Sequence, residues 1–85
     1  MSTTQESWCV SIRLLLASGH SVIHEIDVTA SAEECRHCAF MCLRIDINKV
    51  ERGDQFVLKR DGKEAGWVNP QDIVGADLIS VQKLA

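Results

Sequence analysis

The segment SAEECRHCAFMCLR, residues 31–44, decides the fold because its helical pattern separates two groups of strand-like segments. Ser31 and Glu34 have the spacing of a capping box, in which the serine hydroxyl and the glutamate side chain each accept from the other residue's amide. The sequence therefore predicts a helix that begins near Ala32. The following RIDIN alternates like a strand, so we place the end of the helix at about Arg44 and expect an irregular connection after it.

Two strand-like segments precede this helix. Trp8–Leu16 alternates apolar and polar residues, as a half-buried strand does. After the turn ASGHS, Val22, Ile26 and Val28 share one phase of a second strand, and His24 falls on that phase. The two segments predict an antiparallel hairpin. We expect a disordered tail over residues 1–7 and a single domain over residues 8–85.

Further short strands are expected after the helix. Asp61-Gly62 suits the positive backbone angles of a tight hairpin turn, and Asn69-Pro70 favours a turn or a single helical turn. The predicted strands are Phe56–Leu58, Gly66–Val68 and Leu78–Leu84.

This order resembles the β-grasp fold of ubiquitin-like proteins over about Trp8–Leu84. QFVLKRDGKEAGWV (55–68), WVNPQDIVGADLISV (67–81) and the apolar spacing of the helix carry the resemblance. It implies an α+β, ββαβββ domain with a mixed sheet packed on one central helix. The implied core residues are Val68, Ile73 and Leu78 or Ile79. Ubiquitin-like modifiers end in a diglycine, whereas this sequence ends VQKLA, so we expect neither conjugation nor a sulfur carrier of that type.

Three of the four cysteines lie on the predicted helix. Cys35, Cys38 and Cys42 share one stripe with Ala39 and Ile45, and we expect this stripe to pack on the sheet, because free cysteine packs as a small hydrophobe. The capping box places Cys35 one turn inside the helix, away from the terminal amides that activate a thiol. Zinc needs four ligands, and a second cysteine pair is absent. No metal or cofactor is expected, although a thiol-redox or zinc-binding protein that uses these three cysteines is the alternative.

Composition and charge exclude several classes of partner. The 85 residues carry nine basic and twelve acidic side chains, a formal charge of -3, and the basic residues are scattered, so we expect no nucleic-acid partner. The longest aliphatic run, Leu14–Ala17, is too short for a signal peptide or a membrane span. We expect a cytoplasmic protein with free thiols and no membrane partner.

No catalytic grouping is visible, so the sequence favours a non-enzymatic protein-protein interaction module. It would be an adaptor, a small subunit or an inhibitor of a larger complex, binding another protein or a second copy of itself. A viral or mobile-element origin would fit the size and acidity. Tryptophan is enriched among residues that dominate interfaces, and a second apolar stripe on the helix is wider than one small sheet should cover. The candidate partner-binding residues are Phe40, Leu43, Ile47, Val50 and Trp67.

Overall fold

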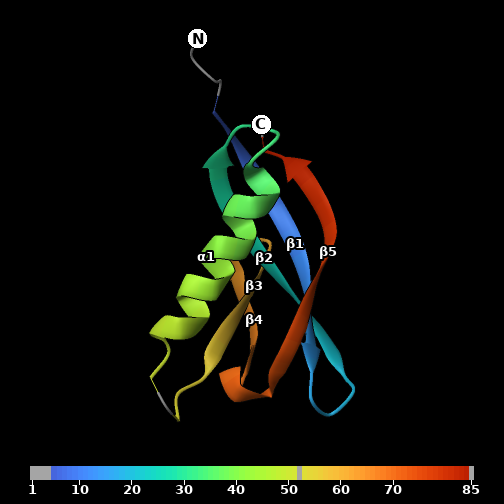
Figure 1. Cartoon of the computed structure of the whole chain (residues 1–85), viewed down its shortest axis with the longest axis vertical. Coiled ribbons are helices and arrows are strands. Elements are labelled where there is room, and N and C mark those ends of the chain that lie inside the picture. Colours follow the sequence, from blue (N-terminus) through green and yellow to red (C-terminus); the bar gives the residue numbers. More distant parts are fainter. Residues whose placement is uncertain (1–4, 52, 85) are drawn as a thin grey trace.

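The computed structural model describes residues 5–51 and 53–84, and over them the chain is a small α+β domain with the expected order of elements. Figure 1 shows the helix lying along one side of the strands. Residues 1–4 of the expected tail and Ala85 of the expected domain lie outside the described residues. Glu6 and Ser7 belong to the first strand. The elements are β1 Glu6–Leu16, β2 Ser21–Ala30, α1 Cys35–Lys49, β3 Phe56–Arg60, β4 Lys63–Val68, the 3-10 turn η1 Pro70–Asp72 and β5 Ile73–Lys83.

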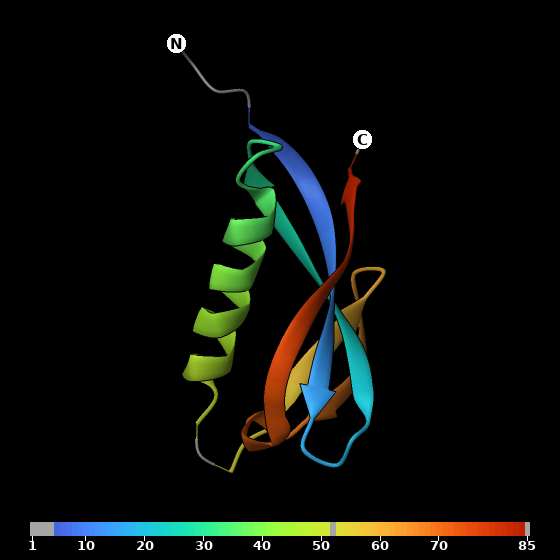
Figure 2. The ribbon, with the colours of Figure 1, turned by 45° about the vertical axis from the view of Figure 1, so that its right-hand side comes forward.

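The β-grasp topology is not confirmed. The strands form one sheet of order β2-β1-β5 and a separate sheet of order β3-β4 (Figure 2). A mixed sheet needs at least one parallel pair, but β1 with β2, β1 with β5 and β3 with β4 are all antiparallel. The prediction of a mixed sheet was therefore wrong for the described residues, while the α+β class was right.

The strand β1 organises the first sheet. Its inner side chains Val10, Ile12 and Leu14 are fully buried, because β2 and β5 cover both of its edges and α1 packs over its inner face. β5 begins at Ile73, five residues before the predicted start at Leu78, and it pairs with β1 from Leu16 to Trp8. The length of β1 thus sets the length of β5.

The hairpin β3–β4 turns where the sequence predicts. Asp61 and Gly62 both have positive φ, 54° and 74°, as a tight turn of this kind requires. Asn69 then caps η1, since its Oδ1 accepts a hydrogen bond of 3.0 Å from the amide of Gln71. Both local predictions are confirmed.

The helix begins and ends later than predicted. A turn over residues 32–34 precedes it, in which the amides of Glu34 and Cys35 donate to the backbone carbonyl of Ser31. Among the described residues no side chain caps the helix at Glu34, so the predicted capping box does not form its start. The helix continues past Arg44 to Lys49, because Ile47 still packs against the core.

The helix is also rotated from the predicted orientation. Its buried residues are Cys35, Ala39 and Leu43, which follow one another at intervals of four. Ile45, which we expected on the sheet side, is 48% exposed. Leu43, which we expected on the partner side, is 4% exposed. The prediction was wrong for both because the face centred on Cys35, Ala39 and Leu43 lies against the strands.

Candidate functional site

The outer face of the β3–β4 hairpin exposes an aromatic side chain. Val57 on β3 lies directly opposite Trp67 on β4, and they are 39% and 60% exposed. The opposite face of the hairpin holds Phe56, Leu58 and Val68, which are buried in the core. Side chains alternate across a strand, so burial of that face directs Trp67 and Val57 away from the core. We call Val57, Lys59, Glu64 and Trp67 the hairpin surface.

A bulge shapes this surface. The register of β3 with β4 shifts after Leu58, which lies opposite Gly66, so that Lys59 lies opposite Glu64. Gly66 has φ of 141°, which L side chains rarely adopt, and this residue sits immediately before Trp67. The bulge keeps a lysine and a glutamate beside the apolar pair. The hairpin surface therefore combines an aromatic centre with charges of both signs.

The second tryptophan has a different environment. Trp8 on β1 is half-buried, and its indole Nε1 donates a 3.0 Å hydrogen bond to the carbonyl of Ala30 at the end of β2. Within the described part of the chain, the indole of Trp67 has no such acceptor. The Trp8 indole is therefore bonded within the sheet, whereas Trp67 is 60% exposed.

The structure does not bring the predicted helix residues together with Trp67 as one exposed surface. Phe40, Ile47 and Val50 are half-buried and pack against the core, and Leu43 is buried in it. The exposed apolar residues of α1 are instead Met41 and Ile45. Their spacing of four places them on one stripe, but sequence reasoning assigned no role to Met41 and gave Ile45 to the core.

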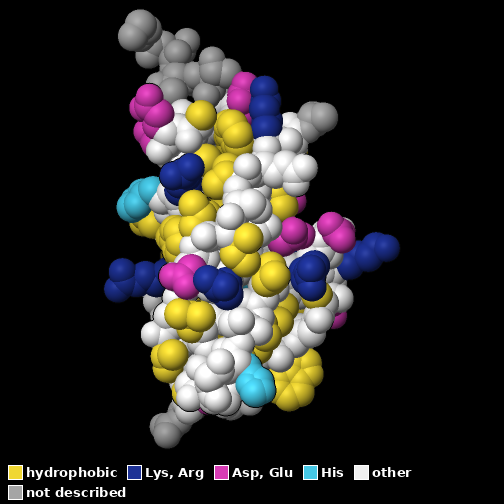
Figure 3. Space-filling model, turned by 90° about the vertical axis from the view of Figure 1, so that its right-hand side faces the viewer, with side chains coloured by type: hydrophobic (Ala, Val, Ile, Leu, Met, Phe, Trp, Pro, Cys, Tyr) yellow, Lys and Arg dark blue, Asp and Glu magenta, His cyan; other side chains and the backbone are white. Residues whose placement is uncertain are grey.

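The side of the molecule that carries β5 is partly apolar. Figure 3 shows hydrophobic side chains along the length of this face, interrupted across its middle by a band of charged side chains. β5 contributes Val74 and Ile79 to the exposed apolar residues. Ile79 lies where the pairing of β5 with β1 shifts, and Asp77 pairs with Arg13 across the two strands at 3.4 Å. Bulges and charges of this kind discourage a sheet edge from adding another strand.

The helix cysteines are core or near-core residues. All four cysteines of the chain lie within the described residues and are free. Cys35 is the first residue of α1, so our reason for placing it a turn inside the helix was wrong. It is nevertheless 2% exposed, and its Sγ donates to the carbonyl of Ala32 at 3.3 Å. Only a protonated thiol can donate that bond, so this geometry does not favour a reactive thiolate.

Cys9 lies apart from the helix cysteines, in a cavity of about 310 Å³ lined in part by Glu25, Asp27 and Asp61. Burial, the neighbouring carboxylates and a hydrogen bond with Asp27 raise the pKa of the Cys9 thiol to about 11. A thiol held protonated in this way is a poor nucleophile. Within residues 5–51 and 53–84, no group of three His, Cys, Asp or Glu side chains could hold a metal ion.

His24 is a hydrogen-bonded core residue, as its strand phase predicts. It is 4% exposed, and its Nδ1 accepts a 3.0 Å hydrogen bond from the amide of Lys59 on β3. Burial is the main cause that lowers the pKa of His24 from its ordinary value. The other two histidines, His20 and His37, are exposed.

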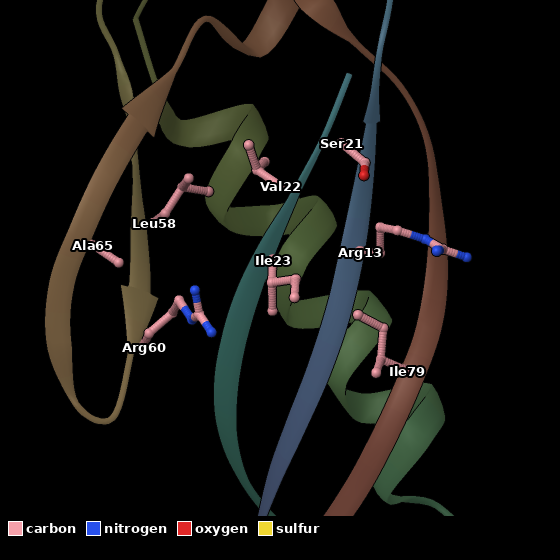
Figure 4. Close-up of a pocket in the computed structure, with 8 residues that line it drawn as sticks. All are labelled: Arg13, Ser21, Val22, Ile23, Leu58, Arg60, Ala65 and Ile79. Atoms are coloured by element: carbon pink, nitrogen blue, oxygen red, sulfur yellow. The ribbon is translucent and has the colours of Figure 1, made fainter. Parts of the chain in front are cut away.

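A groove of about 460 Å³ opens on the side of the strands opposite α1. Figure 4 shows Leu58, Arg60 and Ala65 extending from the hairpin toward β2, while Arg13 and Ile79 belong to β1 and β5. Among the described residues that line it there is no histidine, cysteine or carboxylate, so no general base lies beside its serine. The lining residues are Arg13, Ser21, Val22, Ile23, Leu58, Arg60, Ala65 and Ile79.

Comparison with known proteins gives no relative: no family model, curated protein or solved structure matches the chain. Among the described residues, no helix is long and apolar enough to cross a membrane.

Proposed function

We propose that the protein is a non-enzymatic interaction module that binds another protein through the hairpin surface. The observation that carries this proposal is the 60% exposure of Trp67 beside the exposed Val57 on a two-stranded sheet. Tryptophan is costly to leave in water and is prominent among the residues that dominate binding energies. The charged pair Lys59 and Glu64 next to it would form part of a polar rim.

The proposed partner presents an apolar pocket that receives the Trp67 indole, with polar groups around the pocket for Lys59 and Glu64. Adaptor, small subunit and inhibitor are all roles that such binding allows, in the cytoplasm or in another compartment. The proposal does not depend on the ubiquitin-like resemblance, because the antiparallel pairing of β1 with β5 departs from a mixed sheet.

A thiol-redox or zinc-binding role has less support. Cys35 donates its thiol hydrogen to a backbone carbonyl, and the pKa of Cys9 is raised rather than lowered. Neither arrangement assists thiolate chemistry or metal ligation, both of which need the deprotonated sulfur.

The test places a photo-crosslinking amino acid at Glu64, in the rim beside Trp67, in the native cell, identifies the proteins captured, and measures their affinity for purified variants. Trp67→Ala should weaken binding by about thirtyfold or more, the effect of losing about 2 kcal/mol at an interface centre. Val74→Ala is the matched control, because Val74 is also exposed but lies on β5, and it should leave affinity unchanged.

Equal affinity of the wild type and Trp67→Ala for every captured protein would contradict the proposal. Concentration-dependent dimerisation that Trp67→Ala abolishes would instead identify the partner as a second copy of the chain. A strictly monomeric protein that captures nothing through position 64 would also contradict it.

A further inference from the structure

The β3–β4 hairpin is attached to the first sheet in an unusual way. β2 and β3 lie next to each other but belong to separate sheets, without a backbone ladder between them. In the described part of the chain, two hydrogen bonds join β2 to the hairpin. The amide of Lys59 donates to His24 Nδ1 at 3.0 Å, and the amide of Asp61 donates to Glu25 Oε1 at 2.6 Å. We call these two bonds the seam.

Side chains, not backbone carbonyls, are therefore the acceptors at the seam. A backbone carbonyl remains an acceptor at any pH, whereas an imidazole nitrogen accepts only while it is unprotonated. Because His24 Nδ1 accepts from Lys59, the neutral ring carries its proton on Nε2. Protonation of Nδ1 would place two N–H donors face to face and leave the Lys59 amide without its partner.

The surroundings of His24 hold the ring neutral and fix its position. The edge of the ring packs against Phe56 of β3, with centroids 5.0 Å apart and planes at 66°. Its cross-strand neighbour on β1 is the apolar Ile12. The charged groups that face it are Asp46 of α1, Lys59 of β3 and Glu25 of β2. Burial and Lys59 lower the pKa of His24, while the two carboxylates oppose this effect without cancelling it.

We propose that His24 is a pH-sensitive latch: protonation of its ring releases the Lys59 amide and loosens the β3–β4 hairpin from β2, while the β2-β1-β5 sheet stays folded. The proposal rests on the geometry of the seam and holds whether or not the hairpin surface binds a partner. The docked hairpin requires a neutral ring, and the released hairpin exposes the ring to water. Docking is therefore fully favoured above about pH 6.5, the ordinary pKa of histidine, and weakens as the pH falls below it.

Amide hydrogen exchange of the wild-type protein, read residue by residue by NMR and corrected for the intrinsic effect of pH, tests the latch. Between about pH 7.5 and about pH 5.5, the opening equilibrium at Lys59 should rise by up to about tenfold, the limit for a docked ring that stays neutral and a released ring that is about nine-tenths protonated at the lower pH. Asp61 should follow, since it lies on the same hairpin. The amides of Val10 and Ile12 on β1 should keep their protection.

Two controls separate the latch from general acid destabilisation. The first control is the protection of the Val10 and Ile12 amides on β1, which general acid destabilisation would lower together with that of Lys59. The variant His24→Asn places an oxygen acceptor near the position of Nδ1 and does not titrate, so its opening at Lys59 should be independent of pH over this range.

Three results would overturn the proposal. Opening at Lys59 could stay constant in the wild type between these two pH values, or β1 could lose protection together with the hairpin. An acid response of the same size that survives in a folded His24→Asn variant would also exclude His24 as its cause. The wild-type measurement decides the question even if that variant does not fold.

Discussion

The orientation of α1 can be tested by truncating two of its residues that lie only two positions apart. Leu43 is 4% exposed and Ile45 is 48% exposed, although the sequence predicts the opposite arrangement. Each substitution to alanine removes a similar amount of hydrocarbon. The difference between their effects on stability therefore reports burial and little else.

The magnitudes follow from the two environments. Removing three carbons from a fully buried site costs about 2.4 kcal/mol in lost transfer free energy, and the cavity left behind raises this to about 3 kcal/mol for Leu43→Ala. Ile45 is about half exposed and leaves no closed cavity, so its transfer loss is about 1 kcal/mol. The better helix propensity of alanine reduces that cost to about 0.5 kcal/mol. A domain of this size has a total stability of about 4–13 kcal/mol, so the first change is severe and the second is mild.

Urea denaturation of the two variants and the wild type measures the difference, provided that the slope of the transition is unchanged. In thermal unfolding, Leu43→Ala should lower Tm by about 12–24 °C and Ile45→Ala by only a few degrees. A larger loss for Ile45→Ala than for Leu43→Ala would refute the orientation of the helix. Equal losses would also refute it, because they would show that the two side chains do not differ in burial.

Two further predictions concern side chains of β1. Because burial and carboxylates raise the pKa of Cys9 to about 11 from 9.0, its alkylation at pH 8 should be about a hundredfold slower in the native than in the denatured protein, as measured by mass spectrometry. The native rate should keep rising through about pH 10, and a plateau below that pH would contradict the raised pKa. Trp8→Phe should destabilise the protein by about 1 kcal/mol or more, because the carbonyl of Ala30 loses its donor. Trp67→Phe is the matched control in the same urea assay and should have almost no effect, and equal losses would show that the Trp8 bond contributes nothing.

Local patterns predicted the local structure well. The alternation in Trp8–Leu16, the Asp61-Gly62 turn and the capped turn at Asn69 all concern residues close in sequence, and all three are present. The core position of His24 followed from its strand phase in the same way. These features depend on backbone angles and side-chain periodicity, which a short segment specifies without reference to the rest of the chain.

Long-range pairing could not be predicted in the same way. The alternation of apolar and polar residues in the last strand fits either a parallel or an antiparallel pairing with β1. The prediction of a mixed sheet therefore came from the ubiquitin-like resemblance, whereas β1 and β5 pair antiparallel. The orientation of the helix was ambiguous for a related reason. Apolar residues cover so much of its circumference that both the stripe of Cys35, Cys38 and Cys42 and the stripe of Cys35, Ala39 and Leu43 look like a core face. Only the position of the strands against it selects one of them.

The candidate site shows the same division between local and long-range information. An exposed tryptophan on a short hairpin was a reasonable candidate from sequence, but its exposure depends on Phe56, Leu58 and Val68 filling the other face of the hairpin. The seam could not have been found, because His24 and Lys59 are 35 residues apart and no spacing rule connects a histidine nitrogen with a distant backbone amide.

The amide donors of the seam and Trp67 lie on the same β3–β4 hairpin. Docking of the hairpin and binding at Trp67 are therefore linked thermodynamically. A partner that binds Trp67 and Val57 only when the hairpin is docked must stabilise the docked state by its own binding free energy. Thermodynamic linkage then has two consequences. The bound partner lowers the pH at which the His24 ring takes up its proton, and protonation of the ring lowers the affinity for the partner by the same factor. A partner that binds the docked and released hairpin equally well would leave the seam unaffected. The response of Lys59 exchange to a bound partner therefore distinguishes a rigid recognition surface from one whose docking is part of recognition.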